Sequence, residues 1–330
     1  MSIKEVIMYK DTIRKAWHIT WNHKYLWFFG LFATILSSAG ASAWDMLVTN
    51  TTRVFDQPQF FANLKILYSS GTLGLVYDNV LTNITHFWNL SPDVLILLIL
   101  MLALLALAIL SQGALIHGAA KLDDGQKTDV HTDFQAGRSS FWRLTGLQVI
   151  FQLAMYGSIF IIGAPLISLY LANGSETPAY IFSFLSYILL LPLSIIIYFI
   201  LLYASIYTVI NKTKIRTSII EAWRLFKKNW LTSLEFAFIL FLINIVIGFI
   251  FVLILAVPAV VIVQSQVAVN AFTIWSLALM LIVFLILSGI LTAFQFNATV
   301  LFMKRISAEN HPGWLHRIFE KLFKKNQSTI

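Results

Sequence analysis

The chain has 330 residues, 58% hydrophobic and only 12% charged, and this balance excludes an ordinary soluble globular domain. Its net charge of +8 would suit nucleic acid, but the basic residues flank apolar runs and form no continuous face, so we expect no nucleic-acid partner. The absence of cysteine excludes disulfides, thiol nucleophiles and thiolate metal sites.

Six apolar runs are long enough to cross a hydrocarbon core of about 30 Å. Only helices or closed barrels satisfy their backbone there, and these runs are too long and too uniformly apolar for barrel strands. We therefore expect an all-α polytopic membrane protein with a single transmembrane domain over residues 1–330. The expected spans are 25–44, 93–117, 144–171, 180–210, 231–262 and 272–303.

The first expected span ends in small residues, and Ala41-Ser42-Ala43 resembles a signal-peptide cleavage site. The polar region before this span is unusually long for a signal peptide, and the apolar core is rich in aromatic residues such as Trp27 and Phe28. These features favour a span that is retained over one that is cleaved.

Lysine and arginine are concentrated in alternate connections between the spans. Only Arg53 and Lys65 lie in the other connections. Because positively charged flanks stay in the cytoplasm during insertion, we expect six crossings of the inner (cytoplasmic) cell membrane, with both termini in the cytoplasm. Membrane lipids are then the expected partners, together with other membrane proteins.

The connections group the spans into three helical hairpins. Those at 172–179 and 263–271 are short, so they predict tight external turns within the second and third hairpins. The connection of the first hairpin, 45–92, is too apolar for a free loop, and we expect it to lie at the outer membrane interface.

A short helix precedes each hairpin, and these lead-ins form an internal repeat. Aligning Ala16-Trp17 with Ala222-Trp223 superimposes apolar residues at the i, i+4, i+7 spacing of one helical face. A weaker middle copy spans 129–143. We expect amphipathic cytoplasmic helices, capped at their N-termini by Thr128 or Asp129 in the middle copy and by Thr217 or Ser218 in the third.

Three short motifs carry a family resemblance: Ala16-Trp17, Ala222-Trp223 and the turn Asp124-Gly125-Gln126-Lys127-Thr128. The chain resembles bacterial six-helix membrane proteins, and the membrane domain fused to some glycerophosphoryl diester phosphodiesterases. The resemblance covers most of the chain but excludes the segment 45–92. It implies the six-helix architecture. The catalytic domain of the fused proteins has no counterpart in this chain, so the resemblance implies no enzymatic activity.

Polar side chains inside apolar runs are costly, which makes them candidates for function. The candidate intramembrane polar site consists of Glu235, Asn244, Gln148, Gln152 and Gln295.

Glu235 has two interpretations. In one, it binds a cation, a proton or a lipid headgroup amine in a polar path between hairpins. In the other, it reaches the cytoplasmic interface and pairs with Arg143, Lys227 or Lys228, while the amides only bond neighbouring helices.

Three tryptophans are candidate interfacial anchors: Trp17, Trp223 and Trp314. Trp314 belongs to a basic tail, 304–330, in which an apolar stripe opposes lysine and arginine. That pattern is typical of an amphipathic helix on the inner leaflet, although positive charge that only determines topology would look the same.

Enzymatic motifs such as GxSxG, Walker A and GxGxxG do not occur, and we expect no cofactor. Four acidic residues gather in the second cytoplasmic connection: Asp123, Asp124, Asp129 and Asp133. A divalent-metal site of a lipid enzyme is a distant alternative. Because basic residues interleave with them, we expect no metal and a solvated, helix-capping loop. The favoured function is non-enzymatic binding or organisation of lipids or membrane partners, with a transporter or lipid translocator as the alternative.

Overall fold

The computed structural model describes residues 3–34, 92–173, 176–264 and 271–308. These residues are helical throughout, apart from short connections. The helices are α1 (Ile3–Asn22), a short helix Tyr25–Thr34, α5 (Pro92–Asp123), α6 (Val130–Asn173), α7 (Glu176–Ile210), α8 (Ile215–Lys228), α9 (Trp230–Gln264) and α10 (Ala271–Ala308).

Within the described ranges, four stretches are long and apolar enough to cross a membrane: Val94–Asp123, Ile188–Ile210, Trp230–Phe251 and Ala278–Ala308. The expected all-α membrane fold is therefore confirmed. The cleavage-site motif, the external segment up to residue 91 and the tail beyond residue 308 lie outside the described residues.

The chain divides into two compact units. The first comprises Met1–Thr34, Ala108–Leu147 and Phe199–Ile330, and the second comprises Ile35–Leu107 and Gln148–Tyr198. In the second unit, large apolar side chains such as Leu97, Leu153 and Leu189 are more than half exposed. Exposed apolar surface of this kind indicates contact with lipid.

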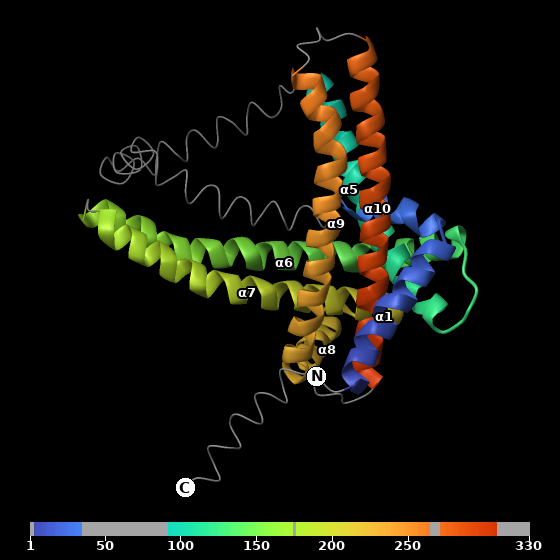
Figure 1. The fold of residues 1–330 in the computed structure, drawn as a ribbon. Helices are drawn as coiled ribbons and strands as arrows, with labels where there is room; N and C mark the ends of the chain where they lie inside the picture. The colour runs from blue at the N-terminus through green and yellow to red at the C-terminus, as the bar shows by residue number, and fades with distance from the viewer. Residues whose placement is uncertain (1–2, 35–91, 174–175, 265–270, 309–330) are drawn as a thin grey trace. The chain divides into compact units, whose positions relative to one another are not determined.

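In the first unit, α10 packs against α1 on one side and α9 on another (Figure 1). Asn297 of α10 donates to Thr20 of α1 at 2.8 Å. Phe302 of α10 stacks on Phe236 of α9, with ring centroids 4.0 Å apart. Arg305, later on α10 than Asn297, bonds to Thr12, which comes earlier on α1, so α10 is antiparallel to α1. Gln295, earlier on α10 than Phe302, bonds to Asn244, which comes later on α9, so α10 is antiparallel to α9 as well.

The internal repeat is visible as a shared burial pattern. Ala16 of α1 and Ala222 of α8 are fully buried, and Gly137 is buried at the matching position of α6. The backbone of Gly137 approaches α5 so closely that an added Cβ would collide with the carbonyl oxygen of Leu110. A small residue at the centre of each copy therefore permits close helix packing.

Each copy also buries a polar residue four positions before the small one. Thr12 of α1, Asp133 of α6 and Ser218 of α8 are all fully buried. Because burying an unpaired polar group is costly, each of them needs a hydrogen-bond partner.

These partners come from the C-terminal end of another apolar helix. Arg305 of α10 donates to Thr12 at 2.8 Å. His117 of α5 lies 2.8 Å from Asp133, and Thr208 of α7 donates to Ser218 at 2.8 Å. Thus α6 bonds to α5, and α8 bonds to α7, which in each case is the apolar helix just before it in the chain. The first repeat helix, α1, bonds to the last apolar helix, α10.

The middle copy differs from the expected separate lead-in helix. In the first and third copies the helix ends, and the backbone N–H groups of His23 and Asn229 close the last turn on Ile19 and Leu225. In the middle copy α6 continues without interruption from Val130 into the apolar run.

The expected capping residues are right for the middle copy and wrong for the third. Asp129 accepts a hydrogen bond from the backbone N–H of Thr132 at 3.1 Å and so caps α6. In the third copy α8 already begins at Ile215, with Lys214 in the capping position, so Thr217 and Ser218 lie inside the helix. The Ser218 hydroxyl bonds to another helix instead of capping its own.

Gly137 offers a test of this packing. We expect Gly137→Ala to destabilise the protein by about 1–3 kcal/mol, because the methyl group forces α6 away from α5. The control is Gly248→Ala, where no heavy atom lies within 4 Å of the added Cβ. Thermal melting in detergent measures both, and equal melting temperatures for the two variants would contradict the close approach.

Candidate functional site

Asp133 is a fully buried carboxylate in the first unit with three described partners. The hydroxyls of Thr128 and Tyr25 donate to it at 2.6 and 3.0 Å. His117 Nδ1 lies 2.8 Å from the same carboxylate and donates to it when Nδ1 carries a proton. Three donors from separate segments therefore compensate the loss of water around this group.

Glycine makes this burial possible. Gly118 follows His117 on α5, and a Cβ added there would lie 2.6 Å from a carboxylate oxygen of Asp133. The sequence interpretation placed Asp133 in a solvated loop, and the structure shows that this is wrong. In the sequence, only His117 indicates this site, because it is a polar side chain at the end of an apolar run. Its partner Asp133 is sixteen residues away on another helix, so no local pattern connects the two.

Two other acidic residues of the connection are paired with lysines. Asp123 forms ion pairs with Lys15 at 2.6 Å and with Lys304 at 3.0 Å, and Asp124 pairs with Lys304 at 2.6 Å. The two lysines also donate to backbone carbonyls at the end of α5, where a helix favours positive charge. In the part of the chain that the structure describes, no three His, Asp or Glu residues form a group able to hold a metal ion.

Glu235 lies at the start of α9 and is buried against α1. The hydroxyl of Tyr9 donates to its carboxylate at 2.6 Å. The Tyr9 ring also packs beside Phe236 and Phe302, with centroids 6.5 and 6.3 Å away. Glu235 therefore links α1 to α9 beside an aromatic cluster.

Two further members of the predicted polar site meet in the structure. Gln295 of α10 donates to Asn244 of α9 at 2.5 Å. Gln148 and Gln152 lie on α6 in the second unit. A path shared by all five residues stays a prediction.

The anchor tryptophans of the first and third copies are equally exposed. Trp17 is 47% exposed and Trp223 is 46% exposed. They occupy matching positions, each directly after the buried alanine of its copy. Trp314 lies outside the described residues.

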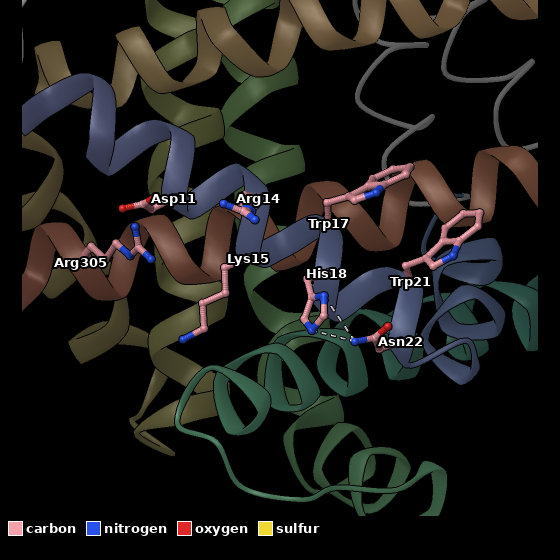
Figure 2. A pocket seen from close by; sticks show the side chains of 8 residues that line it. All are labelled: Asp11, Arg14, Lys15, Trp17, His18, Trp21, Asn22 and Arg305. Atoms are coloured by element: carbon pink, nitrogen blue, oxygen red, sulfur yellow. Dashed lines mark hydrogen bonds between the residues drawn. The ribbon is translucent and has the colours of Figure 1, made fainter. Parts of the chain in front are cut away.

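An open pocket of about 650 Å³ follows α1 and reaches the end of α10 (Figure 2). Its lining combines basic and aromatic side chains: Asp11, Arg14, Lys15, Trp17, His18, Trp21, Asn22 and Arg305. The sequence interpretation singled out only Trp17 among these residues. The others share one face of α1 at i, i+3, i+4 spacing, but Arg305 joins them only because α10 packs antiparallel to α1.

The pocket is polar at one end and aromatic at the other. Figure 2 shows Arg14 and Arg305 toward one end, with Trp17 and Trp21 toward the other. The two tryptophan rings stack with centroids 5.6 Å apart, and Trp17 also contacts Phe294 of α10 edge-on at 5.8 Å. Such a lining suits an amphiphilic ligand with one anionic end.

A family model described as the membrane domain of glycerophosphoryl diester phosphodiesterase matches residues 60–329. The match includes α5 to α10, and it includes residues 60–92, which the resemblance was expected to exclude. It leaves out α1 and with it Ala16-Trp17. No curated protein and no solved structure matches the chain.

The buried carboxylate provides a second test. Asp133→Ala removes the acceptor of three donors, and we expect it to destabilise the protein by about 3 kcal/mol or more, because each buried donor left unpaired costs about 1–3 kcal/mol. The control is Asp129→Ala, which removes an exposed helix cap and should lower the melting temperature much less. Melting in detergent distinguishes them. If the two variants melt together, Asp133 does not join these helices.

Proposed function

The chain belongs to the family of the membrane domain of glycerophosphoryl diester phosphodiesterase, and we propose that it is a non-enzymatic integral membrane protein that binds and organises membrane lipids. In this proposal it crosses the inner membrane six times as three hairpins, with both termini and the lead-in helices on the cytoplasmic side. The matched family is a membrane domain, distinct from the catalytic domain of the phosphodiesterase.

The matching exposure of Trp17 and Trp223 supports this proposal most directly. Tryptophan favours the headgroup zone, where its ring meets apolar chains and its N–H meets water. Lys227 and Lys228 follow Trp223 in the last turn of α8, and Arg14 and Lys15 precede Trp17. Basic side chains beside interfacial tryptophans are attracted to the anionic lipids of the cytoplasmic leaflet.

The contacts of the acidic residues favour a binding role over a catalytic one. Asp123 and Asp124 are neutralised by lysines, Asp129 caps a helix, and Asp133 accepts three hydrogen bonds. Each carboxylate thus has a structural explanation.

A translocator is the second candidate, and the pair Asn244–Gln295 favours it. Asn244 lies fourteen residues after the start of α9, about 21 Å along a helix axis. That depth is about two thirds of a hydrocarbon core, where polar groups mark candidate pathways. A hydrogen bond that only joins α9 to α10 would look the same.

Lipid retention tests the favoured function. We expect the double variant Trp17→Ala, Trp223→Ala to retain several-fold less phospholipid in native mass spectrometry after gentle extraction, because both interfacial rings are lost. The control is Trp275→Ala, which removes an exposed tryptophan near the opposite end of α10. Unchanged retention in the double variant would refute the proposed role of these helices.

Glu235 separates the two candidates. We expect Glu235→Gln to retain lipid as the wild type does, because the amide oxygen can still accept the hydrogen bond from Tyr9. Proton and cation flux into proteoliposomes is the second measurement, with exposed Glu221→Gln of α8 as the control. A flux that is present in the wild type and lost only in Glu235→Gln would favour the translocator.

A further inference from the structure

We propose that the pocket between α1 and the end of α10 binds the headgroup of one anionic phospholipid from the cytoplasmic leaflet, with Arg14 as the main phosphate ligand. The proposal rests on the lipid-binding function above and names the site and the lipid class. Seven of its eight lining residues belong to α1, which lies outside the matched family region, and Arg305 lies inside that region.

Arg14 is available for a ligand. Its side chain is exposed, and among the described residues it has no hydrogen bond or ion pair. A planar guanidinium with several donors matches two phosphate oxygens at once, which an ammonium group does not. Arg305 supports the same end of the pocket, since its bonds to Met8 and Thr12 use only one of its nitrogens.

The charges of the lining favour a singly charged ligand. Lys15 and Lys304 form ion pairs with Asp123 and Asp124, so the charges of these four side chains cancel. Arg14, Arg305 and Asp11 then leave one unbalanced positive charge in the pocket. A phosphodiester headgroup carries one negative charge, and Asp11 offers an acceptor for headgroup hydroxyls.

The direction of the pocket agrees with the orientation of a lipid. Arg305 lies about three turns beyond Phe294 on α10, which is about 16 Å along the axis. The basic end therefore lies nearer the end of the helix, and Trp17 and Trp21 lie deeper beside Phe294. A headgroup bound at the arginines would place its acyl chains over the tryptophans.

The third copy of the repeat lacks this combination. It keeps Trp223, but Ile220 replaces Arg14, and Lys227 replaces Trp21. If these helices were attracted to the membrane only in a general way, the first and third copies would not need to differ at these two positions. A specific headgroup site in the first copy explains why Arg14 and Trp21 occur there and not in the third copy.

The experiment uses the full-length chain in nanodiscs that contain equal amounts of phosphatidylglycerol and phosphatidylethanolamine, followed by native mass spectrometry. We expect one phosphatidylglycerol to be retained per wild-type chain. Arg14→Gln should weaken its retention about ten-fold, as for one charge-assisted hydrogen-bonded contact. Arg14→Lys, which keeps the charge without the planar fork, should be intermediate. The matched control is Arg138→Gln, which removes an exposed arginine of α6 and should have no effect.

The outcomes distinguish the specific headgroup site from the general lipid-binding function proposed above. Equal losses in Arg14→Gln and Arg138→Gln would overturn the site and leave only general electrostatic attraction. Unchanged retention in Arg14→Gln, with loss in the double tryptophan variant, would overturn the site while the lipid-binding function stands. Displacement of the lipid by millimolar inorganic phosphate would show a site for free phosphate and overturn the lipid assignment. Equal melting temperatures of all variants confirm that each is folded.

Discussion

A hydrogen bond between a buried polar side chain and the end of another helix occurs three times in the first unit, and the arrangement of its helices depends on it. Thr12, Asp133 and Ser218 each occupy the same position of a repeat helix and bond to the end of α10, α5 or α7. In an apolar environment such a group must find a partner or pay its full desolvation cost. The bonds therefore select one pairing of helices, and the small residue four positions later lets the backbones approach.

The three bonds join different kinds of groups. The bond of Ser218 joins two neutral hydroxyls, its own and that of Thr208. The hydroxyl of Thr12 instead accepts a bond from the charged guanidinium of Arg305. Asp133 brings a carboxyl group with two oxygens into a site with no exposed surface, and three donors surround it, more than the other copies have. A buried carboxyl group destabilises every arrangement in which its donors are missing, so the middle copy selects its neighbours through more contacts than the other two.

The sequence predicts what is local and periodic. Continuous apolar character predicts the helices α9 and α10, and the tryptophan after each alanine aligns Ala16 with Ala222. The middle copy was weak because glycine replaces alanine at Gly137 and arginine follows it. The partners of Asp133 were missed because Tyr25 is 108 residues away, and no local pattern joins them. The pocket was missed for the same reason, since Arg305 reaches α1 only through packing.

Divergence between the copies shows which positions serve the fold and which are free to serve binding. The inward positions keep their chemistry: a polar residue that bonds to a neighbour, then a small residue that permits contact. The outward positions do not, since Arg14 and Trp21 correspond to Ile220 and Lys227 in the third copy. Trp17 packs edge-on against Phe294, but packing does not require the exposed Arg14 beside it, so the repeat itself does not explain why cations and stacked rings occur together on one copy. A ligand that only the first copy meets, beside Arg305 of α10, provides that cause.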